Sequence, residues 1–137
     1  MTAAAEIIHS YPADLGRVDR RALIRCLEGC VSCAQACTSC ADACLCESDD
    51  QLPTLRRYIR SDEDCADVCS ATARMLSRHT GYDANVTHTV LQACIVVCRS
   101  CGDECARHAA QHEHCRVCTQ ACRRCEQACQ ELIEALS

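Results

Sequence analysis

The stretch CLEGCVSCAQACTSCADAC, residues 26–44, carries six cysteines at alternating steps of four and three residues. This alternation is the spacing of the buried seam of an α-helix. At about 100° per residue, the six thiols fall within roughly ±40° of one line along that helix. Thiolates are soft ligands that select Cu(I), zinc or iron–sulfur clusters. The predicted metal ligands of this stretch are Cys26, Cys30, Cys33, Cys37, Cys40 and Cys44.

Three later segments repeat this spacing. The pattern C-x3-C-x2-C-x3-C occurs within residues 94–105 and 115–129, and a shorter C-x3-C pair spans residues 65–69. On helices, these thiols also share one face and can meet those of residues 26–44. The further candidate ligands are Cys65, Cys69, Cys94, Cys98, Cys101, Cys105, Cys115, Cys118, Cys122, Cys125 and Cys129.

The charge of the metal favours one kind of cargo. A zinc site of four thiolates carries a net charge of −2, so four such sites in one core would leave about −8 buried. Cu(I) carries one positive charge, so a filling near one ion per thiolate is about neutral. A two-coordinate ion between i and i+4 thiols needs a span of about twice a 2.3 Å bond, which adjacent helical turns can supply. Multiple Cu(I) ions per chain are therefore predicted.

Disulfides are a less favoured use of these thiols. Neighbouring positions along one helical stripe lie farther apart than a disulfide allows. Residues 1–17 also show neither the basic nor the apolar region of a secretory signal. We therefore expect a cytoplasmic protein whose thiols stay reduced. Filling of the core by small apolar side chains is the other structural explanation, and a single buried cysteine would favour it.

Two other functions stay open on the residues alone. A protein that binds or buffers zinc is the main alternative to Cu(I) storage. A thiol redox or iron–sulfur protein, using pairs such as Cys30 and Cys33, is less favoured because iron–sulfur motifs usually lie in loops. Storage requires no catalytic step, so an enzyme is not predicted.

The elements that position the thiols are four long amphipathic helices. We expect them over residues 18–46, 53–79, 84–110 and 113–136, joined by short connections. Such a chain is typical of an all-α, antiparallel up-down-up-down four-helix bundle with a cysteine-lined core. Residues 17–137 are predicted to form this metal-binding domain. Residues 1–16 form an N-terminal extension whose apolar residues Ile7, Ile8 and Tyr11 could pack on the bundle or on another subunit.

The two ends of the predicted bundle differ in chemistry. Antiparallel packing brings Leu23, Leu76, Leu91 and Leu132 to one end, with Met75 and Leu136 nearby. The opposite end receives Cys44, Cys46, Asp62, His108 and His112. One end is thus an apolar plug, and the other is a polar entrance for metal.

Some residues near the entrance are ambiguous. Cys46 lies about 200° from Cys44 around the helix, so it is equally consistent with a bystander thiol and with a ligand at the entrance. His114 lies off the cysteine seam, which favours a surface position over a ligand. His9, His79 and His88 lie away from the polar end and are expected at the surface.

Composition limits the partners. The formal net charge is −5, and no basic face is clustered, so nucleic acid is not an expected partner. No apolar run is long enough to span a membrane. Copper ions are the predicted partners, with copper chaperones or small-molecule thiols as their carriers.

The cysteine stripes at 26–44, 94–105 and 115–129, together with the pair Cys65 and Cys69, resemble those of the bacterial copper storage proteins. The resemblance covers about residues 18–136, and the N-terminus is similar to the cytosolic branch. It implies a homotetramer of bundles, many Cu(I) ions inside each, and loading at one end. In that family comparison, Asp62, His108 and His112 would occupy the entrance.

Overall fold

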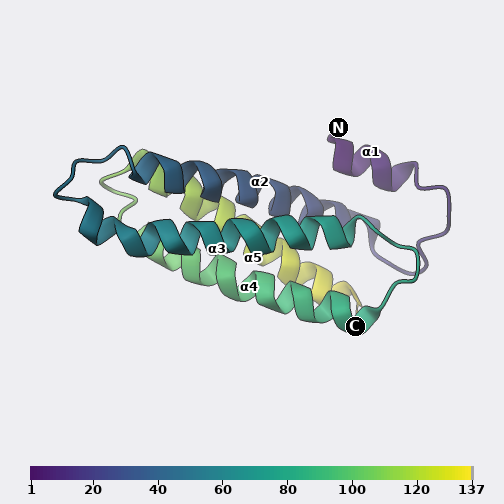
Figure 1. Cartoon of the computed structure of the whole chain (residues 1–137). Coiled ribbons are helices and arrows are strands. Elements are labelled where there is room, and N and C mark those ends of the chain that lie inside the picture. Colours follow the sequence, from purple (N-terminus) through teal and green to yellow (C-terminus); the bar gives the residue numbers. More distant parts are fainter. Residues whose placement is uncertain (137) are drawn as a thin grey trace.

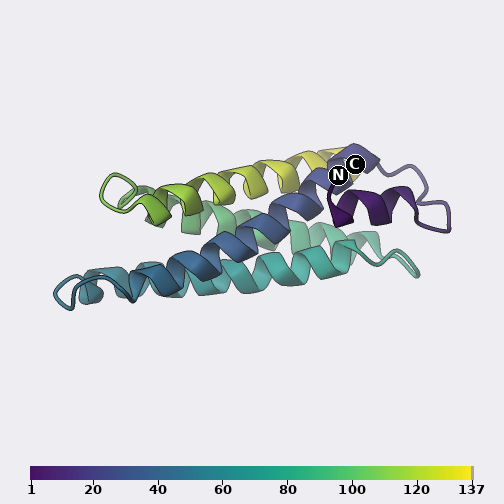
Figure 2. The same cartoon turned by 90° about the horizontal axis from the view of Figure 1, so that it is seen from above.

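The computed structural model describes residues 1–136, which form five helices. A short helix α1 (Ala3–His9) precedes four long ones, α2 (Arg20–Cys44), α3 (Leu52–Leu76), α4 (Ala84–Ala106) and α5 (Glu113–Leu136). The long helices lie side by side in an elongated bundle, and successive helices run in opposite directions (Figures 1 and 2). Each packs against two neighbours, in the cyclic order α2–α3–α4–α5. The predicted four-helix bundle is confirmed.

Local signals explain where these helices begin. The side chain of Asp19 accepts a hydrogen bond from the backbone of Ala22 at the start of α2, and Asp83 caps α4 in the same way. Pro53 occupies the first turn of α3, where its missing N–H removes no helical bond. In the turn between α3 and α4, Gly81 has a φ of 65°, a left-handed backbone conformation that other residues rarely adopt.

Three helices end earlier than the sequence predicted. Helix α2 ends at Cys44 instead of residue 46, α3 at Leu76 instead of 79, and α4 at Ala106 instead of 110. The chain tightens beyond each end, where backbone N–H groups bond to carbonyls three residues back, as from Cys46 to Ala43 and from His108 to Cys105. Cys46 and His108 therefore lie on turns and His112 lies directly before α5, so helical phase does not fix their directions.

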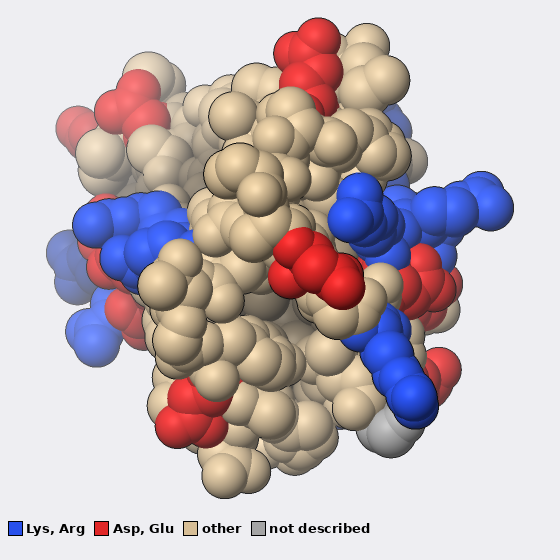
Figure 3. All heavy atoms as spheres, turned by 90° about the vertical axis from the view of Figure 1, so that its right-hand side faces the viewer, with Lys and Arg blue, Asp and Glu red and all other residues tan. Residues whose placement is uncertain are grey.

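One end of the bundle is apolar, as predicted. Leu23, Leu76, Leu91 and Leu132 are all buried there, and Met75 and Leu136 are partly buried. Thr72 is buried just inside this layer and donates its hydroxyl to the carbonyl of Val68, so its polar atom is satisfied. Figure 3 views this end, where uncharged residues predominate over the centre and Arg side chains project from the periphery.

The N-terminal extension packs on the outside of the bundle. Helix α1 contacts α2, as Figures 1 and 2 show. Ile8 is buried in this contact, whereas Ile7 is 57% exposed. The ring of Tyr11 meets His79 edge-on at 5.1 Å between centroids. None of the helices in residues 1–136 combines the length and apolarity needed to cross a membrane.

Candidate metal centre

The core of the bundle is a column of sulfur atoms. Within residues 1–136, seventeen of the eighteen cysteines are buried and all eighteen are free thiols. Three groups of four overlap, because Cys33, Cys37, Cys65 and Cys122 each belong to two of them, and a fourth group shares none of these members. Within each group the four Sγ atoms lie within 4.8 Å of one another. Four of these groups are Cys30, Cys94, Cys125 and Cys129; Cys33, Cys65, Cys69 and Cys98; Cys33, Cys37, Cys65 and Cys122; and Cys37, Cys101, Cys118 and Cys122.

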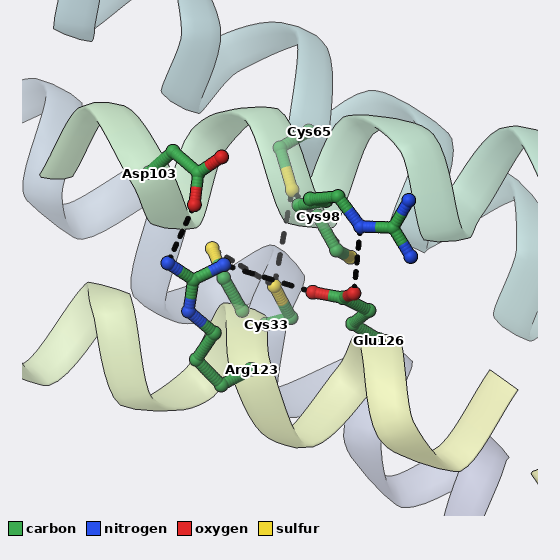
Figure 4. A network of polar contacts seen from close by, with 8 residues as sticks. Cys33, Cys65, Cys98, Asp103, Arg123 and Glu126 are labelled. Carbon is green, nitrogen blue, oxygen red and sulfur yellow. Dashed lines mark hydrogen bonds and ion pairs between the residues drawn. The ribbon is translucent and has the colours of Figure 1, made fainter. Parts of the chain in front are cut away.

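All four long helices contribute to this sulfur column. The Sγ atom of Cys33 on α2 lies 3.9 Å from that of Cys65 on α3 and 3.7 Å from that of Cys122 on α5. Cys65 in turn lies 3.8 Å from Cys98 on α4. Figure 4 shows Cys33, Cys65 and Cys98 meeting in the interior. Sulfurs at these separations can share one ion without a change of fold, and neighbouring sites can share sulfurs.

An outer set of ion pairs joins α4 to α5 around the column. Arg123 on α5 pairs with Asp103 on α4 at 2.6 Å, and Arg99 on α4 pairs with Glu126 on α5 at 2.9 Å (Figure 4). These side chains are partly exposed, so each pair contributes at most about 1 kcal/mol. They keep charge outside the helices, whereas the interior presents sulfur alone along most of its length.

Burial favours the protonated form of the thiols in the column, and for some of them contact with neighbouring thiols acts in the same direction. Hydrogen bonds with neighbouring thiols, that of Cys125 first, raise the pKa of Cys98, and burial raises it further. Contacts led by Cys101, together with burial, raise the pKa of Cys118 to about 12. Several unpaired thiolates within about 4 Å of one another in a dry core would also repel. A metal ion that binds here must therefore displace protons.

Asp62 is the one acidic side chain that the structure buries in residues 1–136. Its Oδ1 atom accepts hydrogen bonds from the thiols of Cys101, Cys118 and Cys105 at 3.1, 3.2 and 3.4 Å. Its Oδ2 atom is buried and has no hydrogen-bond partner among the described residues. Burial, followed by the nearby Cys101 sulfur, raises the pKa of Asp62 to about 8. Asp62 thus stands within the sulfur column, near its polar end.

The polar end carries a cluster that we call the mouth, made of Glu47, Tyr58, His108, His112 and His114. The hydroxyl of Tyr58 on α3 contacts Nε2 of His108. The rings of His108 and His112 stack at 6.3 Å, and those of His112 and His114 lie 5.5 Å apart. All five residues are buried or half-buried. His108 and His112 lie together at this end, whereas the contacts of Asp62 are with thiols of the column.

His114 reaches the sulfur column, which the sequence did not indicate. Its Nδ1 atom lies 3.3 Å from Sγ of Cys40 and 3.7 Å from Sγ of Cys115. These residues and Cys44 form a further group whose ligand atoms lie within 4.8 Å of one another. The helical phase expected from the sequence put His114 off the cysteine seam, because that argument concerns one helix and not its neighbours. Its ring instead extends sideways towards α2.

Glu47 and Tyr58 are mouth residues to which the sequence gave no role. Tyr58 falls within the helix expected over residues 53–79, the second of the four, but its contact with His108 depends on the turn after α4. Glu47 lies in the connection after α2, where no periodicity applies. The pair of histidines at 112 and 114, directly before Cys115, was the available signal for this cluster.

The remaining candidates lie away from the column. Cys46 is exposed on the turn after α2, so the bystander and ligand interpretations both remain predictions. His9 and His88 are exposed, as expected. His79 lies at the apolar end, half-buried, with burial lowering its pKa.

Comparisons with known proteins agree with this architecture. A sequence model of a family described as "Copper storage protein" matches residues 19–134. A curated relative from Bacillus subtilis (strain 168), the "Uncharacterized cysteine-rich protein YhjQ", is 33% identical over 96 residues, covering 70% of this chain and 82% of its own.

Solved structures give the same result. The copper storage protein Ccsp from Streptomyces lividans, loaded with 10 copper equivalents, is 65% identical with a TM-score of 0.92, covering 97% of this chain and 99% of its own. A structure described as a cytosolic copper storage protein from the same organism, with five coppers, is 68% identical with a TM-score of 0.79 and covers 83% of this chain and 93% of its own. The Cu(I)-bound copper storage protein BsCsp3 is 33% identical, with a TM-score of 0.66, over 78% of this chain and 93% of its own. The resemblance in the cysteine stripes is confirmed, and the chain belongs to the copper storage protein family.

Proposed function

We propose that this protein stores Cu(I) in the cytoplasm, with many ions held by the thiolates of one bundle. The observation that carries the proposal is the continuous sulfur column, closed at one end by leucines and opening at the other onto imidazole and carboxylate groups. Cu(I) is the cargo that soft ligands select and that leaves the smallest charge in the core. The copper carried by the Streptomyces lividans relatives supports the same cargo.

We assign the metal-binding residues as follows. Thiolates of the column hold the stored ions, and the mouth receives them. Exposed Cys46 is included only as a ligand of the mouth. The proposed set is Cys26, Cys30, Cys33, Cys37, Cys40, Cys44, Cys46, Cys65, Cys69, Cys94, Cys98, Cys101, Cys105, Cys115, Cys118, Cys122, Cys125, Cys129, Asp62, His108 and His112.

Each binding event exchanges a proton for an ion. A thiol releases its proton as its sulfur binds Cu(I), so the positive charge entering the core is balanced by one leaving it. Asp62, whose Oδ1 atom accepts from three thiols and whose raised pKa keeps it protonated at neutral pH, can release its own proton as ions bind nearby. Filling of the column then changes its total charge little. No bond in a substrate is made or broken, so we propose no catalytic role.

The wider organisation is also proposed. Residues 17–137 form the storage domain, and residues 1–16 form an extension that packs on it. We propose a homotetramer, on the family resemblance, and copper chaperones or small-molecule thiols as the carriers of the ion. Sedimentation equilibrium of the metal-free protein tests the tetramer, which a monomer or dimer would contradict.

The decisive experiment for storage is an anaerobic titration of the reduced protein with Cu(I) against a competing chelator. We expect saturation on the order of ten or more ions per chain, because seventeen buried thiols are available. Saturation at about four ions or fewer, the number that four-thiolate sites would accommodate, contradicts storage. Zinc that is bound on purification and resists displacement by Cu(I) would instead favour the zinc-buffering alternative.

A further inference from the structure

Glu47 joins two histidines of the mouth through one oxygen atom. It lies on the turn after α2, where its backbone N–H bonds to the carbonyl of Cys44 at 3.2 Å. Its Oε1 atom is 3.1 Å from Nδ1 of His112 and 3.3 Å from Nε2 of His114. The side chains of the two histidines are only 11% and 26% exposed, so water competes weakly for these contacts.

The contact with His114 fixes which nitrogen carries the proton. A neutral imidazole has one N–H and one lone pair, and a carboxylate can only accept. An unprotonated Nε2 facing a carboxylate oxygen at 3.3 Å would place two lone pairs against each other. Nε2 therefore carries the proton and donates it to Glu47. The lone pair of His114 is then on Nδ1, the atom that faces Cys40 and Cys115.

The contact with His112 fixes the opposite tautomer in that ring. Here Nδ1 is the atom that lies 3.1 Å from the same oxygen, so Nδ1 carries the proton. The lone pair of His112 is then on Nε2. One carboxylate thus holds two neighbouring rings in opposite tautomers, and each ring keeps one nitrogen free to bind an ion.

We propose that Glu47 is a positioning residue of the mouth, which orients His112 and His114 and selects opposite tautomers in them. Metal-binding histidines commonly donate their second N–H to a carboxylate, which fixes the ring and raises its basicity. The His114 ring then presents a lone pair to the sulfur column, and the His112 ring presents one away from Glu47. This inference rests on the proposed function, since it concerns the groups through which Cu(I) reaches the column.

The first test is made on metal-free protein. Long-range ¹H–¹⁵N spectra of the reduced, ¹⁵N-histidine-labelled full chain at pH 8 report which ring nitrogen is protonated. We expect Nδ1–H for His112 and Nε2–H for His114 in the unsubstituted protein. In Glu47→Ala, His112 loses its preference for Nδ1–H. Unchanged tautomers in Glu47→Ala overturn the proposal.

The matched control is Asp50→Ala. Asp50 is an exposed acid in the same connection between α2 and α3 and forms no ion pair among the described residues, so both tautomers should persist. The second readout is the rate of first Cu(I) uptake in stopped-flow, which Glu47→Ala should slow by about 10-fold or more, with the ion capacity unchanged. A rate equal to that of Asp50→Ala overturns the proposal. A low capacity in the unsubstituted protein would instead contradict storage itself, and the tautomer result does not depend on it.

Discussion

At the scale of single residues, the protein places an acid where its ionised form is least stable. Asp62 is fully buried, and only one of its two oxygens is hydrogen-bonded among the described residues. The three thiols that donate to it come from α4 and α5, so the carboxyl group links three helices at the polar end of the column. A buried acid of this kind keeps its proton at neutral pH in the metal-free state.

The raised pKa of Asp62 predicts how the stability of the metal-free protein depends on pH. The carboxyl group loses its proton near 3.8 when the chain is unfolded but near 8 when it is folded. Between these values the folded state binds more protons, so the free energy of unfolding falls as pH rises, by on the order of a few kcal/mol. Below pH 3.8 this contribution is fully present, and above pH 8 it is lost.

Asp62→Asn provides the comparison, because its amide does not titrate. Denaturant unfolding of both reduced, metal-free proteins should show a weaker decline between pH 5 and 8 for Asp62→Asn. Equal slopes in the two proteins would mean that Asp62 is ionised in the folded state.

Substitutions in the column and in the mouth should change different properties of Cu(I) binding, namely the capacity and the rate of loading. Cys33→Ala and Cys37→Ala each remove a sulfur that two groups share, so Cu(I) capacity should fall by about one ion or more per substitution. His108→Ala and His112→Ala should slow loading and leave capacity nearly unchanged. Chelator titration measures the first quantity and stopped-flow absorbance the second. Ser32→Ala, which changes an exposed side chain next to Cys33 that is outside the proposed metal-binding set, is the control for capacity.

The same phenotype in both sets would contradict the division into column and mouth. A loss of capacity in His112→Ala as large as in Cys33→Ala would place the imidazole among the storage ligands.

At the scale of the elements, the helices were predictable and their ends were not. Alternating steps of three and four residues follow from 3.6 residues per turn, so the seam from Cys26 to Cys44 fixed both the helix and its buried face. The same argument placed Leu91 and Leu132 at the apolar end. It did not predict the position of the His114 ring, whose contact with Cys40 depends on how α5 lies against α2. Nor did it predict the contacts of Glu47, which lies beyond the end of α2, where helical periodicity no longer applies.

The apolar end should carry much of the stability of the metal-free bundle. Sulfur fills the column with small side chains, whereas Leu91 is a large side chain with no exposure, packed with Leu23 and Leu132. Leu91→Ala should therefore lower the free energy of unfolding by about 2–5 kcal/mol. Urea denaturation measures this change.

A matched leucine tests that assignment. Leu45 is 59% exposed on the turn after α2, so Leu45→Ala should cost about 0.5 kcal/mol or less. A similar loss in both variants would show that the leucine layer contributes no more than a surface leucine.

At the scale of the whole molecule, the bundle is a container with a direction. Both connections that flank the mouth, α2–α3 and α4–α5, lie at one end in Figure 1, and the leucine layer lies at the other. The charged residues stay outside, as the Arg123 and Arg99 pairs illustrate, so the interior is reserved for sulfur and Asp62. Filling such an interior stabilises it, because ions that bind only the folded state favour that state by mass action.

The central claim is that Cu(I) ions occupy the axis of the bundle and bind the buried thiolates. Anomalous diffraction at the copper edge, from crystals of anaerobically loaded protein, tests it most directly. The account predicts a row of copper peaks between the leucine layer and the mouth, each bonded to Sγ atoms at about 2.3 Å or less. Copper confined to the outer surface, with the column still metal-free after saturation, would contradict it.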